Sequence, residues 1–228
     1  MISSDVVTEA RVVCDFDRVF LKVDSAVSEV VVSQANRESL MITGRPDILS
    51  RIKTEVRDGQ LSVTLGGGWS DKLGRALTTS LTRQWVRCDL TVKDLTCLEL
   101  AGLVRGRASD LQTDRLAVRL RGASIVSVEA LDADLLDVSM RGTCQMEVTG
   151  TVREQRVDLE GMGSYDAPHL ESLTTTVNIR GSGKATVWAT ENLDVTTRGL
   201  GSVEYHGTPQ VKKQASPMAS VVRAAGPR

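Results

Sequence analysis

The stretches VDLEGMGSYDA (residues 157–167) and VNIRGSGKATV (residues 177–187) are two copies of one pattern, twenty residues apart. Each copy alternates apolar with polar residues, reaches a charged residue and a glycine, and then starts a second short alternating run. Alternation with a period of two predicts β-strands. Repetition near twenty residues predicts a solenoid, in which each copy forms one coil.

The pattern reaches a glycine six times, and these glycines are 20, 20, 19, 20 and 18 residues apart. They are Gly102, Gly122, Gly142, Gly161, Gly181 and Gly199. We expect them at corners between two strands, where a left-handed backbone conformation or close stacking of coils leaves no room for a Cβ.

A coil of this length holds no crossover helix, so each strand must pair in parallel with its copy in the next coil. The expected fold is all-β, a right-handed parallel β-helix (β-solenoid) with about 20 residues per coil. The handedness is taken from the general preference of parallel crossovers.

The alternation also predicts which side chains point inward. The first strand of each coil contributes Val118, Val138, Val157 and Val177, and the second contributes Val126, Met146, Tyr165, Ala185 and Val203. The outward set of the second strand is Ser127, Glu147, Asp166, Thr186 and Glu204. Single anchors on a looser third side are Leu111, Leu131, Leu170 and Leu193.

Four segments are expected within one domain. Residues 1–65 form irregular β coils or a cap, 66–84 a loop insertion with one helical turn near 72–77, and 85–209 the regular solenoid. Residues 210–228 supply at most one capping strand, near 220–223, and a tail. Because this end is weakly capped, we expect self-association through it, as a homo-oligomer or a fibre.

Composition excludes some classes of protein. Lys and Arg number 28 against 29 Asp and Glu, with no block of like charge, so nucleic acid is not an expected partner. No apolar run is long enough to cross a bilayer, and the N-terminal residues lack the features of a signal peptide. Cys14, Cys88, Cys97 and Cys144 are expected as buried apolar side chains, with a Cys88–Cys97 disulfide as the alternative.

Two outward columns carry charge. Glu147, Asp166 and Glu204 form an acidic column that is either solvated surface or the carboxylates of a hydrolase. Arg121, Arg141, Arg180 and Arg198 precede corner glycines, with Glu160 among them. They form either an ion ladder or a stripe for an anionic ligand such as an acidic glycan or lipopolysaccharide. His169 and His206 lie in turns of coils that are not adjacent, so they suggest neither a metal pair nor a catalytic triad. We expect no metal, no cofactor and no catalytic residues. Trp188 either packs against a loop or offers a platform for a sugar.

Several stretches carry a family resemblance: FDRVFLKV (16–23), TEVRDGQLSVTL (54–65), the repeated glycine corners and VEYHGTPQV (203–211). With these the chain resembles a bacterial family, the putative auto-transporter adhesin, head GIN domain proteins. The resemblance implies adhesion at the cell envelope or outside the cell, and it brings no catalytic residues. The missing signal peptide leaves a cytoplasmic location as the alternative.

We therefore expect a non-enzymatic β-solenoid scaffold for adhesion, binding or assembly, with a glycan or another envelope component as a partner. The alternative is a carbohydrate-active enzyme, of the polysaccharide lyase or hydrolase type, on the same parallel β-helix.

Overall fold

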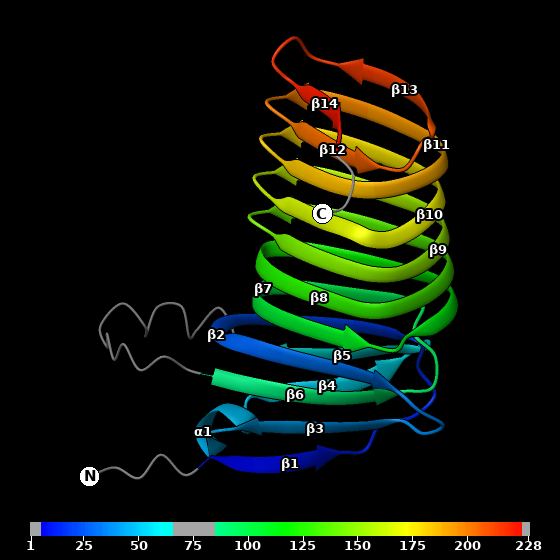
Figure 1. The fold of residues 1–228 in the computed structure, drawn as a ribbon. Coiled ribbons are helices and arrows are strands. Elements are labelled where there is room, and N and C mark those ends of the chain that lie inside the picture. The colour runs from blue at the N-terminus through cyan, green and yellow to red at the C-terminus, as the bar shows by residue number, and fades with distance from the viewer. Residues whose placement is uncertain (1–5, 66–84, 225–228) are drawn as a thin grey trace, which may run out of the picture.

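The computed structural model describes residues 6–65 and 85–224, with the side chains of 23–27 left out. The strands are stacked as coils from the N-terminal end to the C-terminal end (Figure 1). Strands on the near side run from left to right in Figure 1 as the chain climbs, so the winding is right-handed. The expected β-solenoid is confirmed, with about six turns spaced roughly 20 residues apart.

The regular coils consist of strands that pair in parallel with the strands before and after them. They are β7 (Cys97–Ser109), β8 (Gln112–Gly142), β9 (Gln145–Gly161), β10 (Ser164–Gly181), β11 (Lys184–Gly199) and β12 (Ser202–His206). Several of these strands bend through a corner and so cover two sides of the coil. Parallel pairing follows from the repeat, because equivalent residues of successive coils lie directly above one another.

The core is a set of such stacked columns. Val138, Val157, Val177 and Val195 are register partners in series, and each is at most 1% exposed. The third-side anchors Leu111, Leu131, Leu170 and Leu193 are buried too. One outward prediction is wrong: Thr186 is only 7% exposed, although its register partners Asp166 and Glu204 are not buried.

The first coil comes from the N-terminal part of the chain. Strand β2 (Arg18–Gln34) pairs in parallel with β7 on one side, and with β5 (Gln60–Leu65) and β6 (Trp85–Val92) on the other. The chain thus forms β2 first, continues through β3 to β6, and stacks β7 on β2 about 60 residues after β2 ends. The alternating pattern of β2 fits this place, because its inward apolar side chains stack between those of β7 on one side and those of β5 and β6 on the other.

Antiparallel strands close the end of the stack beneath β2. Strand β4 (Ile52–Arg57) pairs with β5 through a tight turn at Asp58 and Gly59, whose φ angles are 50° and 74°. Asp-Gly favours such a turn because both positions need positive φ. Strand β3 (Ser39–Gly44) pairs with β6, and β1 (Val7–Arg11) pairs with β3. The short helix α1 (Pro46–Leu49) links β3 to β4. The predicted insertion at 66–84, including its helical turn, lies outside the described residues.

Two strands close the C-terminal end, where the sequence predicted at most one. Strand β14 (Ser220–Arg223) lies at the predicted place and pairs with β12, while β13 (Gln210–Ala215) pairs with β11. Strand β13 is exposed along its whole length, and Val211 and Ala215 are its only apolar residues. Its pairing therefore rests on backbone hydrogen bonds, which leave no pattern in the sequence.

The four cysteines are free. Cys88 and Cys144 are buried as expected, and Cys97 is half-buried. The prediction for Cys14 is wrong: this residue is exposed, because it lies in the connection between β1 and β2 and not in a strand.

Candidate functional site at the glycine corner

The six corner glycines stack along one edge of the solenoid. All six have positive φ, between 106° and 124°. The residue after the glycine donates its N–H to the glycine carbonyl of the previous coil, as Met162 does to Gly142 at 3.0 Å and Leu200 to Gly181 at 2.9 Å. The backbone therefore makes a narrow turn and holds that next residue outward.

The residues after the corner glycines form a column at the outermost point of this edge, which we call the tip column. It consists of Leu103, Ala123, Thr143, Met162, Ser182 and Leu200, and Met218 continues it between β13 and β14. Leu103, Met162, Leu200 and Met218 are 56%, 63%, 57% and 77% exposed. Sequence reasoning missed this column. The available signal was a large apolar residue next to a corner glycine, belonging to neither inward set.

The arginine column lies immediately before the corner glycines. It consists of Arg121, Arg141, Glu160, Arg180 and Arg198, all exposed. Two of its arginines make ion pairs, Arg121 with Glu99 at 3.0 Å and Arg141 with Glu160 at 3.2 Å. Arg180 and Arg198 are register partners of each other, and neither pairs with an acid among the described residues. The upper part of the column therefore presents two adjacent arginines without an ion pair in the described parts of the chain, next to Glu160, which is the other register partner of Arg180 and is paired with Arg141.

A shallow depression of about 200 Å³ lies beside the arginine column. Arg141, Arg180, Asp158, Glu160 and Asn178 contribute to its lining. Both charge signs meet in it, so the depression itself does not select an anion. Of the two arginines that pair with no described acid, Arg180 lies at its rim and Arg198 lies one coil further along the stack.

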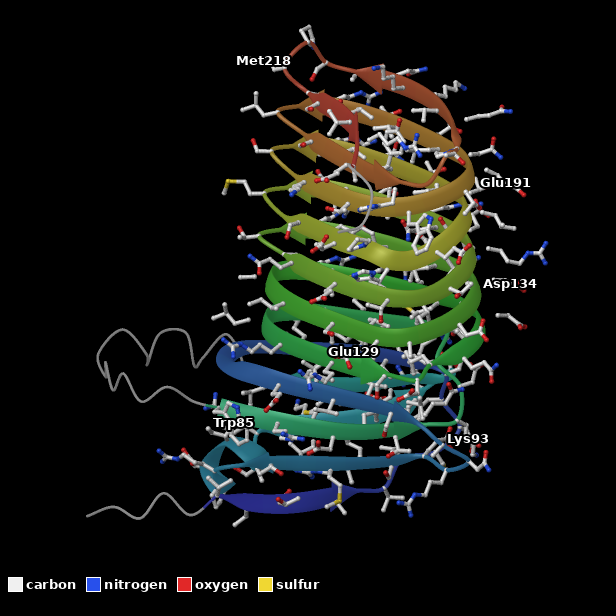
Figure 2. All side chains as sticks on the ribbon, viewed as in Figure 1. Trp85, Lys93, Glu129, Asp134, Glu191 and Met218 are labelled. Atoms are coloured by element: carbon white, nitrogen blue, oxygen red, sulfur yellow. The ribbon has the colours of Figure 1, made fainter. Side chains whose placement is uncertain are left out.

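The opposite edge of the solenoid is acidic. Asp94, Asp114, Asp132 and Asp134 line a depression of about 670 Å³ there, together with Lys93 and Arg153. Figure 2 shows Asp134 and Glu191 on the side of the stack opposite Met218. Although the net charge of the whole chain is only −1, its charge is divided between two edges.

The acidic column of the second strand has the predicted register but not the form of a catalytic cleft. Glu147 and Asp166 are register partners, and Thr186 separates Asp166 from Glu204. Glu147 and Asp166 are exposed, and neither lines the depressions described above. Glu204 lies 3.9 Å from Lys184. The arrangement is that of side chains on an open strand face.

The remaining candidates do not converge on one another. His169 is register partner of Thr149, and His206 of Trp188. Trp188 is half-buried and packs against the turn after β12, where a Cβ on Gly207 would lie 3.2 Å from its Cδ1. Within residues 6–65 and 85–224, no group of three or more His, Cys, Asp or Glu side chains is placed to hold a metal ion.

The thiols are not activated. Burial raises the pKa of Cys88 to about 12. Burial also raises the pKa of Cys97, although the guanidinium of Arg119 lies 3.2 Å from its sulfur. A nucleophilic cysteine needs a lowered pKa, so neither residue is suited to covalent catalysis.

Comparison with known proteins places this architecture among solved bacterial structures. A putative adhesin from Bacteroides fragilis NCTC 9343 has 20% sequence identity and a TM-score of 0.81, over 97% of this chain and 98% of that chain. A putative lipid binding protein from Parabacteroides distasonis ATCC 8503 has 19% identity and a TM-score of 0.71, over 98% of both chains. A putative adhesin from Parabacteroides merdae ATCC 43184 has 18% identity and a TM-score of 0.71, also over 98% of both chains. At these identities the likeness establishes the fold alone.

A search of curated proteins found no match. None of the helical structure in the described parts of the chain has the length and apolar character of a membrane span. The family described as "Putative auto-transporter adhesin, head GIN domain" matches residues 20–209. The match covers most of the chain, from the third residue of β2 to beyond the end of β12, and the chain therefore belongs to this family.

Proposed function

We propose that the protein is a non-enzymatic scaffold that binds at the bacterial cell envelope, with the glycine-corner edge as its binding surface. The observation that carries the proposal is the pair of adjacent columns on this edge, one basic and one partly apolar, both held outward by the backbone. Membership of a family described as adhesins supports an adhesive role and a location at or outside the envelope.

The carbohydrate-active alternative rests on Glu147 and Asp166, which are the two carboxylates in direct register. A glycosidase needs one carboxyl group that stays protonated in an apolar pocket while its partner is ionised. Both residues are exposed on a strand face, where water solvates both charges. The geometry therefore favours the scaffold.

A screen for polysaccharide cleavage tests whether the protein is an enzyme. The purified chain is incubated with acidic and neutral polysaccharides, and new reducing ends and unsaturated products are measured. We expect no turnover above the level of an Asp166→Asn variant. Turnover by the natural chain that this variant lacks would overturn the proposal in favour of the enzyme.

A binding assay tests the choice of edge. Labelled protein is mixed with isolated bacterial envelopes and pelleted, and the bound fraction is compared between variants. The Arg180→Gln/Arg198→Gln variant should lose binding, while Arg153→Gln on the acidic edge should bind like the natural chain. Equal binding by all three proteins would remove the glycine-corner edge from the proposal.

A further inference from the structure

We propose that the glycine-corner edge docks on an anionic phospholipid surface, with the tip column entering the headgroup region and the arginine column contacting the phosphates. The inference rests on the proposed function, because it names the chemical class of the partner that the same edge binds. Four kinds of observation carry it: exposure, geometry, charge and the convex shape of the edge.

The first observation is the concentration of exposed apolar side chains. Leu103, Met162, Leu200 and Met218 belong to one column, and Ile125, which is 52% exposed, lies two residues beyond it. Isolated exposed apolar residues are ordinary, but exposed apolar residues gathered on one edge indicate a surface that contacts a protein or a membrane. Six coil steps separate Leu103 from Met218, so the tip column extends about 29 Å at the spacing of paired strands, with the small residues Ala123, Thr143 and Ser182 between its large apolar members.

The second observation is that these side chains cannot turn inward. The N–H groups of Met162 and Leu200 are bonded to glycine carbonyls of the coils below, and the corner backbone has positive φ. A glycine follows each of these two tips, and there is no room for a side chain at it: an added Cβ would lie 2.7 Å from the carbonyl oxygen of Cys144 at Gly163, and 3.0 Å from Cγ2 of Ile179 at Gly201. These side chains therefore remain exposed to water unless another molecule or a membrane covers them.

The third observation is charge. Arg121, Arg141, Arg180 and Arg198 flank the tips on one side, and Arg105 and Lys184 lie two residues beyond the tips on the other. Glu160 is the single acid in these three columns. An anionic leaflet attracts such basic residues, while the acidic edge around Asp134 is repelled by it (Figure 2). The two effects orient the solenoid with its long axis parallel to the membrane.

The fourth observation is shape, which distinguishes a lipid surface from other anionic partners. The tips project from the narrowest turn of each coil and therefore form a ridge, not a groove. A rigid partner meets a ridge only along its crest, whereas a fluid leaflet closes around it. A soluble acidic glycan would use the arginines but would gain nothing from four exposed apolar tips.

Vesicle flotation tests the proposal with the full-length chain. Vesicles of phosphatidylglycerol and phosphatidylcholine in equal amounts are compared with vesicles of phosphatidylcholine alone, at low and high salt. We expect the natural chain to float with the anionic vesicles, to remain largely unbound with the neutral ones, and to bind less as salt screens the arginines.

Two variants separate the contributions. Arg180→Gln/Arg198→Gln and Leu103→Ser/Met162→Ser/Leu200→Ser should each lower the partition coefficient by about ten-fold or more. Matched controls on the acidic edge, Arg153→Gln and the 40% exposed Leu173→Ser, should stay within about two-fold of the natural chain, at the scale of a surface change that misses the interface. Thermal melting of every variant checks that the fold is kept.

Several results would overturn the proposal: no flotation of the natural chain, equal flotation with neutral vesicles, or a loss in the arginine variant without a loss in the tip variant. The last result would show that charge alone holds the protein on the vesicles, which is how it would bind any polyanion, and that the tips do not enter the headgroup region. All three outcomes leave the turnover screen and the envelope assay unaffected, so a failure here is distinct from a failure of the scaffold proposal.

Discussion

At the scale of single residues, the corner glycines and the polar groups inside the core set the tolerance to mutation. A Cβ on Gly142 would lie 2.4 Å from the carbonyl oxygen of Gly122, and its φ is 110°. The clash is with backbone, which cannot move without shifting the coil below. By contrast, Gly183 has no positive φ, and the atoms nearest to its added Cβ belong to the side chains of Ile179 and Leu159.

Gly142→Ala should therefore lower the free energy of unfolding by about 2–4 kcal/mol, since it combines backbone strain with a steric clash. Gly183→Ala is the matched control and should cost about 1 kcal/mol or less, because side chains can yield. Urea unfolding followed by circular dichroism measures both. Equal losses in the two variants would contradict the assignment of the corner.

Gln155 gives a prediction of opposite sign. It is fully buried, and neither its amide nitrogen nor its amide oxygen has a hydrogen-bond partner among the described residues. Its register partner on the preceding coil is Leu136.

Gln155→Met keeps the length of the side chain and removes two unpaired polar groups, so the free energy of unfolding should rise by about 1–2 kcal/mol. Gln145→Met, on the exposed side of the same strand, should change it by less than about 0.5 kcal/mol. A loss of stability in Gln155→Met would indicate that the buried amide is satisfied in solution.

At the scale of the elements, the connection between β1 and β2 is fixed by one carboxylate. Glu38 accepts hydrogen bonds from the N–H groups of Asp15 at 3.1 Å and Phe16 at 3.3 Å, and its carboxylate lies 3.2 Å from the ammonium of Lys93. Burial acts to raise the pKa of Glu38, but these contacts outweigh it, and the pKa lies below the ordinary value of 4.5. The carboxylate thus joins the start of the first coil to the connection between β6 and β7.

A lowered pKa in the folded state adds stability above the ordinary value, and this stability is lost as the pH falls through the folded-state pKa. Glu38→Gln should accordingly lower the free energy of unfolding by about 1 kcal/mol at pH 7, and the difference should close at pH values below 4.5. Glu55→Gln, whose side chain is 66% exposed, should show no such difference at either pH. Thermal melting across this range is the measurement, and a difference that persists in acid would contradict the electrostatic explanation.

The sequence predicted the elements where side chains determine them. The alternating residues of β7 to β12 and the period of the corner glycines were sufficient for the parallel solenoid and its core columns. They were insufficient for β13, where pairing depends on the backbone, and for the place of β2, which depends on contacts between residues about 80 positions apart. The arginine column was visible in the sequence, but the exposure of Met162 and Leu200 was missed, because its only signal was their place next to a corner glycine, outside both inward sets.

At the scale of the whole molecule, the stack has two ends, and they are protected differently. Antiparallel strands close the N-terminal end. At the C-terminal end β13 carries Lys212 and Lys213, both exposed, and β14 covers part of the last core layer. Lysines on an edge strand oppose pairing with a further strand. Self-association through this end stays a proposal, and the lysines indicate that it is weak while β13 and β14 are in place.

A chain ending at Gln210 should expose the edges of β11 and β12 and should associate more strongly than the full chain. Size-exclusion chromatography with light scattering on both chains gives the mass of each. A monomer in both cases, with unchanged solubility, would leave end-to-end association without support. Larger assemblies of the full chain alone would instead assign the contact to β13 and β14.

The interleaved position of β2 gives the solenoid a direction of growth. Coils from β7 onward add by pairing residues about twenty positions apart, whereas β7 itself rests on a strand laid down far earlier in the chain. Everything beneath that strand is encoded before residue 97, so a ribosome releases the base of the stack first. The N-terminal part then acts as a template for the rest. Each later coil folds onto the coil before it, so that folding proceeds one coil at a time toward the C-terminus.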